Sequence, residues 1–192
     1  GIHGSIYHSH SFDSFITHMP GWKVVIPSNP LDAYGLMLAA IKDPNPVMYL
    51  EPKALLRTKG SERIPGEPEE KELRDRIDAP LGDRTSWKPR WPELKEFVIP
   101  IGKAKLCREG SDGTVVSYGR TLPLCLEAGD ALAREGFTFD VLDLRSLAPY
   151  DWEAIAKSIR KTGRVLFVNE DTEVTNFGEH LLRRTIDEFF YE

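Results

Sequence analysis

Several histidines near the start of the chain have the chemistry needed for proton transfer. His8, His10 and His18 all lie within residues 7–20, where aromatic side chains alternate with them. A neutral imidazole accepts or donates a proton near pH 7, and a partly apolar environment moves its pKa within that range. This stretch is therefore the best candidate for an acid–base site. A histidine among aromatic residues can equally be a packed, hydrogen-bonded structural residue, and the pattern alone leaves that alternative open.

Other catalytic arrangements lack residues that they need. The sequence contains no nucleophile elbow, and Cys107 and Cys125 do not have the spacing of a zinc site. Ser9 is next to His8 and His10. The sequence offers no acidic residue, apart from this segment, in the pattern by which a serine hydrolase orients its histidine. Acid–base chemistry by a histidine thus remains the leading interpretation.

Composition limits the classes of protein to consider. The 192 residues, 41% of them hydrophobic, can supply the core of one large or two small globular units. A net charge of -5 argues against nucleic acid as a partner. No run of residues is long and apolar enough to span a bilayer, so no membrane association is expected. Two cysteines are too few for a disulfide framework, which favours a reducing, cytoplasmic location.

The first part of the chain predicts a strand, a helix and a second strand. Lys23–Ile26 is a short apolar run typical of a buried strand. Asn29 is a capping residue followed by proline, and apolar residues then recur at helical spacing until Asp43–Pro46, where two prolines end the helix. Val47–Leu50 resumes as a strand. A strand, helix, strand order implies that the two strands are parallel.

Residues 57–96 have a different character, rich in charged residues, proline and glycine. We interpret them as a long surface connection that packs Trp87 and Trp91 on a neighbour. A disordered linker is the alternative, since compact domains seldom contain an unstructured loop of this length.

The last part, residues 97–192, predicts a second unit of alternating strands and helices. Strands are expected at Thr114–Tyr118, Phe139–Leu144 and Arg164–Val168. Helices are expected between them, with Gly136 ending the first and Asp151 capping the second, and a final helix follows. The predicted fold class is α/β, with two doubly wound parallel-sheet units. The second unit has no glycine-rich nucleotide-binding signature.

Ordered blocks along most of the chain resemble the beta subunit of thiamine-diphosphate-dependent 2-oxoacid dehydrogenases. The resemblance is nearest to the branched-chain, 2-oxoisovalerate type, and the pyruvate enzymes are also similar. The matching blocks are Tyr7–Phe12, Met19–Ser28, Pro46–Lys53, Phe97–Lys105, Asp143–Asp151 and Lys161–Arg164. Several blocks in the family's order are more specific than any single short motif.

This resemblance implies a transketolase-like fold in which both units are incomplete. Residues 1–56 correspond to the second half of the pyrimidine-binding domain, 57–96 to the polar connection, and 97–192 to a shortened C-terminal domain. The chain is accordingly expected to be a piece of a longer protein at both ends. In the family, the glutamate that contacts the cofactor lies in the half of the domain that is not in this sequence.

The resemblance also implies cofactors and partners. The cofactor is thiamine diphosphate with Mg²⁺, bound mostly by parts outside this sequence, together with a potassium ion. The partners are an alpha subunit, or the alpha part of a fused chain, and a lipoyl-bearing acyltransferase core, in a dimer or heterotetramer. The activity is oxidative decarboxylation of branched-chain 2-oxoacids with acyl transfer to lipoamide. Two alternatives remain: a pyruvate-type or other transketolase-like member, and a non-catalytic fragment that serves subunit assembly.

By the same resemblance, His8 is the catalytic residue. It matches the histidine of the family's His-Ser-Gln loop, which is implicated in proton transfer during acyl transfer to lipoamide. His10 replaces the usual glutamine and adds charge below about pH 6.5. His3, His18 and His180 are interpreted as structural.

A potassium site is predicted at the end of the first helix, where the sequence resembles the family's potassium loop. Hard monovalent cations prefer oxygen ligands, and a helix carboxyl end offers unpaired carbonyls. The main-chain oxygens of Ala40, Ile41, Asp43 and Asn45 are the expected ligands. Spacing alone also fits an ordinary helix end stopped by proline.

Two further pairs of charged residues are assigned structural roles. Glu51 and Lys53 follow the second predicted strand and are expected at an interface or in salt bridges. Arg145 with Asp143 is expected to stabilise a contact between subunits.

Overall fold

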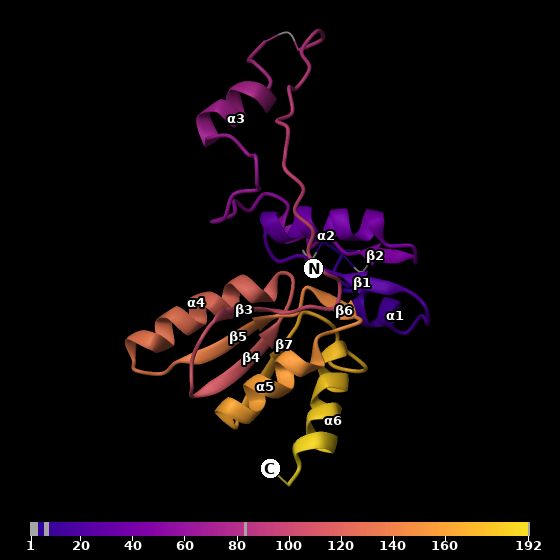
Figure 1. Ribbon diagram of the computed structural model, residues 1–192, viewed down its shortest axis with the longest axis vertical. Coiled ribbons are helices and arrows are strands. Elements are labelled where there is room, and N and C mark those ends of the chain that lie inside the picture. Colours follow the sequence, from indigo (N-terminus) through magenta and orange to yellow (C-terminus); the bar gives the residue numbers. More distant parts are fainter. Residues whose placement is uncertain (1–3, 6–7, 83, 192) are drawn as a thin grey trace.

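The computed structural model describes residues 4–5, 8–82 and 84–191, and shows two sheets side by side with helices packed around them (Figure 1). An extended arm of residues 57–96 projects from the body at one end (Figure 1). The elements are α1 Asp13–Thr17, β1 Lys23–Val25, α2 Pro30–Lys42, β2 Val47–Tyr49, a 3-10 turn Lys53–Leu55, α3 Glu70–Ile77, β3 Lys105–Arg108, β4 Gly113–Ser117, α4 Thr121–Arg134, β5 Phe139–Asp143, β6 Ser146–Ala148, α5 Trp152–Thr162, β7 Val165–Val168 and α6 Phe177–Phe189.

The first sheet has the order β2-β1-β6. β1 and β2 are parallel, with Lys23 opposite Val47, as the strand, helix, strand pattern predicts. The helix α2 between them begins as expected, because the Asn29 side chain accepts a hydrogen bond from the Asp32 N–H at 2.9 Å and Pro30 occupies the first turn. β6 comes from the second half of the chain and pairs antiparallel with β1, so the two halves share this sheet.

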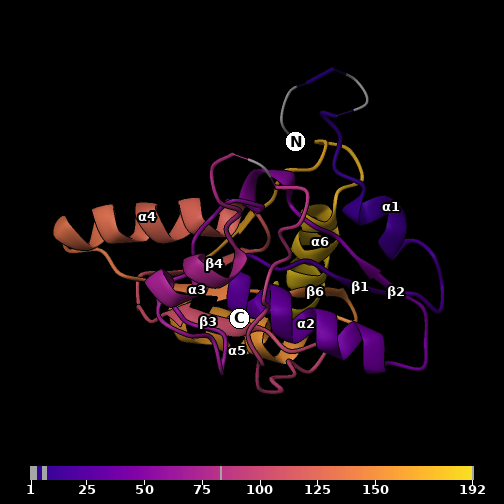
Figure 2. The same cartoon turned by 90° about the horizontal axis from the view of Figure 1, so that it is seen from above.

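The second sheet has the order β3-β5-β4-β7. β4 is parallel to both β5 and β7, and the edge strand β3 is antiparallel to β5. In Figure 1, α4 lies on one side of this sheet, and α5 and α6 lie on the other; Figure 2 gives the perpendicular view. Asp151 accepts from the Ala154 N–H at the start of α5, and Gly163 ends this helix with φ +68°.

The predicted α/β architecture is thus present, and the parallel strands and main helices lie close to where the sequence pattern placed them. Each sheet is mixed, because β3 and β6 add one antiparallel strand apiece. These two strands and the short α1 span three to five residues. β1 and β2 are equally short, but they flank a helix with clear start and stop signals, which identified them as strands.

One hydrophobic core extends under both sheets. Val24 of β1, Leu142 of β5 and Leu147 of β6 are almost fully buried in the same cluster. Ile155 of α5 and Leu181 of α6 close the cluster from the helical side. The two halves of the chain therefore fold against each other and not as separate bodies on a linker.

A buried ion pair joins the two halves. The Arg145 guanidinium donates to both carboxylate oxygens of Asp32 at the start of α2, at 2.9 and 3.2 Å. Arg145 has φ +58°, and its backbone N–H donates to Asp143 Oδ1 at 3.1 Å. Asp32 is 1% exposed and Asp143 is fully buried. Arg145 therefore has an ionic partner within the chain and joins the two halves, and its expected role with Asp143 in a contact between subunits stays a prediction.

The arm contains a helix that the composition did not predict. α3 has two ion pairs at the i, i+4 spacing, from Arg74 to Glu70 and from Arg76 to Glu72. The segment that returns to the body is linked to α3 by a backbone hydrogen bond from Arg90 N–H to Arg76 O at 2.9 Å. Trp87 is half-buried, whereas Trp91 is 71% exposed and does not pack on the body of this chain.

Candidate active site

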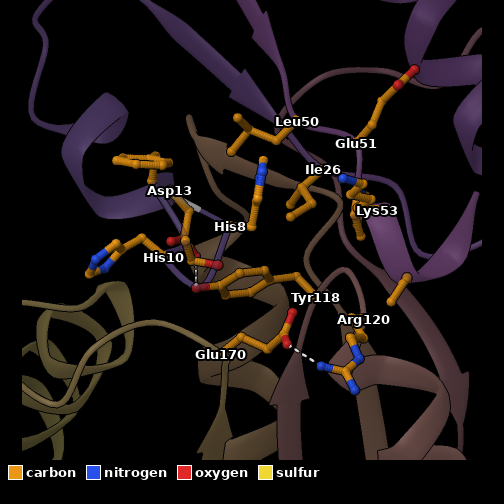
Figure 3. Close-up of a pocket in the computed structure, with 14 residues that line it drawn as sticks. His8, His10, Asp13, Ile26, Leu50, Glu51, Lys53, Tyr118, Arg120 and Glu170 are labelled. Carbon is orange, nitrogen blue, oxygen red and sulfur yellow. Dashed lines mark hydrogen bonds and ion pairs between the residues drawn. The ribbon is translucent and has the colours of Figure 1, made fainter. Parts of the chain in front are cut away.

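A cavity of about 280 Å³ lies where the segment of His8 meets the ends of both sheets (Figure 3). Its polar lining includes His8, His10, Asp13, Tyr118 and Arg120. The acidic residues Glu51 and Glu170 and the ammonium of Lys53 are also part of its wall, together with apolar side chains from Ile26 and Leu50.

The position of the cavity follows from strand direction. Ile26 and Leu50 come directly after the parallel strands β1 and β2, and Tyr118 and Glu170 come shortly after β4 and β7. The carboxyl ends of parallel strands share one edge of a sheet, where ligands bind in open α/β sheets. The two sheets therefore present their ligand-binding edges to one cavity.

His8 and His10 are exposed side chains in this wall, and both lie within reach of a ligand. The backbone of His8 is held by a hydrogen bond from its N–H to Ser5 O at 3.2 Å. The ring of His10 lies near that of Phe12, with centroids 6.2 Å apart. The structure thus brings the predicted catalytic histidine and its neighbour to a cavity, as an acid–base group requires. Its catalytic role remains a prediction.

Asp13 is a site residue that the sequence did not single out. Its carboxylate is 3% exposed and accepts a hydrogen bond from the Tyr118 hydroxyl at 2.6 Å. Burial, together with the nearby carboxylate of Asp171, raises the pKa of Asp13 to about 6, although the Tyr118 bond acts in the opposite direction. Burial also raises the pKa of the Tyr118 hydroxyl. No sequence signal identifies this pair, because the two residues are far apart along the chain.

Charged residues on the opposite wall are engaged with each other. Arg120 donates to Glu170 at 2.6 Å, which links the segment after β4 to the segment after β7. Glu51 and Lys53 line the same cavity, so they lie beside the candidate active site. Their expected place at an interface is not tested by the single chain.

His18 and His180 do not line this cavity. His180 Nε2 is 2.8 Å from the Tyr150 hydroxyl, and burial with two neighbouring arginines lowers the pKa of its imidazole. His18 is exposed just after α1. His3 and Tyr7 lie outside the described residues.

The predicted potassium loop follows α2, which ends at Lys42 as expected. Asp43 Oδ2 accepts from Lys23 at 2.5 Å, and Asp43 Oδ1 accepts from the backbone and side-chain N–H groups of Asn45, each at 2.9 Å. The Lys23 ammonium holds the pKa of Asp43 at about 2. These hydrogen bonds engage both oxygens of the Asp43 carboxylate, and they order the turn. The proposed ligands are main-chain oxygens of Ala40, Ile41, Asp43 and Asn45, and their binding of a cation stays a prediction.

The cavity fits part of a thiamine-type cofactor. Ile26 and Leu50 offer an apolar surface beside two imidazoles, which suits one side of an aromatic ring. Among residues 4–5, 8–82 and 84–191, no cluster of three or more histidine, cysteine or acidic side chains could hold a metal ion. In this same part of the chain, no helix is long and apolar enough to cross a membrane.

Two family models match the chain at the two halves of this site. Residues 1–59 match the transketolase pyrimidine binding domain, and residues 102–192 match the transketolase C-terminal domain. A solved structure of a split gene transketolase, described as an inactive beta4 tetramer, superposes with a TM-score of 0.66 at 21% identity over 92% of this chain and 48% of that one. This likeness shows the fold.

Curated relatives are beta subunits. The chain is 39% identical over 173 residues to the 2-oxoisovalerate dehydrogenase subunit beta of Bacillus subtilis, covering 90% of this chain and 44% of that protein. It is 36% identical to the 3-methyl-2-oxobutanoate dehydrogenase subunit beta of Mycobacterium tuberculosis, covering 100% and 47%. It is 34% identical to the pyruvate dehydrogenase E1 component subunit beta of Acholeplasma laidlawii, covering 100% and 50%. The chain spans about half the length of these relatives. It belongs to the transketolase-like family, with the pyrimidine-binding and C-terminal domains that are found in the beta subunits of 2-oxoacid dehydrogenases.

Proposed function

We propose that the chain is part of the beta subunit, or beta part, of a thiamine-diphosphate-dependent 2-oxoacid dehydrogenase that transfers acyl groups to lipoamide. The observation that supports this most directly is the position of His8 in a cavity lined by the ends of both sheets. An alpha subunit or alpha part completes the site, and a lipoyl-bearing acyltransferase core receives the product.

In this proposal, His8 supplies the proton for acyl transfer. Opening of the dithiolane leaves a sulfur that must be protonated as the acyl group moves to the other sulfur. His8 is exposed at the cavity, so its imidazole can reach a lipoyl group that enters from solvent. The cofactor supplies the electron sink for decarboxylation, and the side chains of this chain bind one side of its ring and orient the proton donor.

We propose a branched-chain 2-oxoacid as the substrate, with pyruvate as the alternative. Two of the three relatives described above are named for branched-chain substrates, but the pyruvate relative is nearly as similar. The ratio of kcat/KM for 2-oxoisovalerate and pyruvate in the complete protein decides between them. A ratio that favours pyruvate would reject the branched-chain assignment and leave the rest of the proposal intact.

The main test is a titration of the complete protein, assembled with its alpha part, with thiamine diphosphate and Mg²⁺. Saturable binding together with release of carbon dioxide from a 2-oxoacid supports the enzyme. A folded assembly that shows neither would support the alternative of a non-catalytic module for subunit assembly.

We expect the isolated chain not to decarboxylate 2-oxoacids. The chain spans about half the length of its relatives, and loss of preorganised groups from a polar site costs orders of magnitude in rate. The measurement is steady-state carbon dioxide release from 2-oxoisovalerate by the purified chain, with the complete protein as the positive control. Turnover by the chain alone would refute this expectation.

We also expect potassium to stabilise the complete protein through the loop after α2. A cation at Ala40–Asn45 would offset the negative end of the helix dipole, and a ligand that binds only the folded state raises stability by about 1–3 kcal/mol at concentrations well above its Kd. Replacing potassium with a bulky organic cation at constant ionic strength should therefore lower the melting temperature. An unchanged melting temperature, with only water-like density at the loop in a high-potassium crystal, would mean that the turn is purely structural.

A further inference from the structure

The segment that contains His8 is fastened at one end by two acidic side chains. Asp13, the first residue of α1, accepts from the Tyr118 hydroxyl just after β4. Ser14, the next residue, donates to Asp171 just after β7. The start of α1 is thus attached to the ends of two adjacent parallel strands. The only covalent connection between His8 and this anchor is four residues long, so the anchor limits where His8 can lie.

The anchor brings two carboxyl groups together in a place with little water. Asp13 is 3% exposed, and its Oδ1 receives no hydrogen bond from any described residue. Asp171 is half-buried, and its Oδ1 accepts from the Thr172 N–H at 2.8 Å. The Asp171 carboxylate faces Asp13 closely enough that its charge opposes ionisation of Asp13. Two adjacent carboxylates repel each other, so the pair has a lower free energy when the two groups share one proton.

We propose that Asp13 is a positioning residue for His8, and that a proton shared between Asp13 and Asp171 holds α1 and the His8 segment against the ends of β4 and β7. Tyr118 supports the pair from the second half of the chain through its hydroxyl. Loss of the shared proton loosens the anchor and lets the His8 segment move away from the cavity. This role in acyl transfer depends on the function proposed above, whereas the proton-dependent anchor itself does not.

The other charged groups around the pair do not supply a simple counter-ion. His8 and His10 lie on the same segment, Arg120 follows β4, and Glu170 precedes Asp171 after β7. The Arg120 guanidinium donates a hydrogen bond of 2.6 Å to the Glu170 carboxylate. Lys53 and Glu51 line the far wall of the cavity and bring charges of opposite sign. His18 is exposed and lines a neighbouring cavity together with Asp171. Among residues 4–5, 8–82 and 84–191, the partners bonded to the two carboxylates are Tyr118, Ser14 and Thr172, which are uncharged, so a proton on the pair is what lowers its charge there.

The direction of the pH effect follows from linkage. The pKa of Asp13 is about 6 in the anchored state and returns toward its ordinary value of 3.8 when α1 detaches and the carboxyl is hydrated. The anchored state therefore binds more protons than the detached state between these two values. Anchoring is strongest below about pH 4 and weakens as the pH rises to about 6, above which the full cost of the buried carboxylate is present.

Hydrogen–deuterium exchange of the complete protein tests this directly and needs no activity. We expect protection of peptides from residues 8–18, corrected for the intrinsic exchange rate, to fall about tenfold between pH 4.5 and pH 7. Peptides from α5, which is not part of the anchor, report the change in overall stability with pH, and the fall in protection of residues 8–18 should exceed theirs. Protection of residues 8–18 that does not depend on pH would overturn the proposal.

Three variants separate a proton-dependent anchor from a merely structural contact. Asp13→Asn keeps an acceptor for Tyr118 and cannot ionise, so the fall in protection should disappear. Tyr118→Phe removes a donor that favours the ionised carboxylate, so the midpoint of the fall should move to higher pH. A structural contact alone would predict lower protection at all pH values with the midpoint unchanged. Glu173→Gln removes a neighbouring exposed charge and should leave the profile as in the wild-type protein.

The pH profile of acyl transfer tests whether the anchor acts on His8. If the complete wild-type protein transfers acyl groups to lipoamide, Asp13→Asn should flatten the part of its pH profile between pH 5 and 7, and Glu173→Gln should leave that profile as in the wild-type protein. An unchanged acyl-transfer profile in the Asp13 variant would reject the link to His8. A wild-type protein without any 2-oxoacid activity would reject the proposed function, and the exchange data would still decide whether the anchor exists.

Discussion

Replacing His8 with alanine in the complete protein is expected to lower acyl transfer to lipoamide by about a hundredfold or more, as for loss of an acid–base group. His8 is exposed in the cavity wall, and no hydrogen bond from its side chain contributes to the described fold. The substitution should consequently leave the melting temperature unchanged. The measurement is the overall rate of acyl transfer with the lipoyl-bearing partner present.

The decisive comparison is between the two half-reactions. Decarboxylation followed with an artificial electron acceptor does not require a proton on the dithiolane sulfur, so His8→Ala should affect it much less. His18→Ala is a matched control, because His18 is also exposed but does not line this cavity. Near-normal acyl transfer in the His8 variant, or an equal loss in both variants, would exclude the proposed role.

Replacing Arg145 with methionine is expected to lower the free energy of unfolding by about 3–5 kcal/mol, because it leaves buried carboxylates without their charged partner. Asp32 and Asp143 are both buried at this junction, and the guanidinium binds Asp32 through two hydrogen bonds. Thermal unfolding of the purified protein should show a melting temperature lower by roughly 10 °C, given about 2–4 °C per kcal/mol at this size.

The loss should depend on pH in a definite direction. Burial, with the charge of Asp32 as the next cause, raises the pKa of Asp143 to about 7. A raised carboxyl pKa means that the folded state binds more protons than the unfolded state, so stability decreases as the pH rises from about 4 to about 7. Arg145→Met should therefore be more destabilising at pH 8 than at pH 5.

A surface arginine provides the control for this variant. Arg183 forms an ion pair with Asp187 on α6, with side chains that are 68% and 57% exposed. Arg183→Met makes the same change in charge but should cost less than about 1 kcal/mol, because an exposed pair gains little. Similar losses for the two variants at pH 8 would show that burial of the Arg145 pair does not contribute as described.

Residues 121–192 illustrate how much of the fold is determined locally. The apolar stripe of α4, the Asp151 cap of α5 and the glycine that ends it all predict element boundaries close to those observed. The direction of the parallel strands β4, β5 and β7 follows from their alternation with helices, because such connections are right-handed crossovers. The sequence also singled out His8 as the candidate for proton chemistry, and the matching blocks around it indicated the family.

Only the tertiary structure decided what His8 faces. Asp13 and Tyr118 are separated by more than a hundred residues, and their contact exists because β6 joins the first sheet and turns the second half of the chain onto α1. The same strand brings Arg145 to Asp32. The pairing of β6 with β1 and the ion pairs between distant residues depend on packing that no local pattern specifies. The type of chemistry could thus be predicted from residue types, whereas the charges and hydrogen bonds that position it depend on long-range contacts.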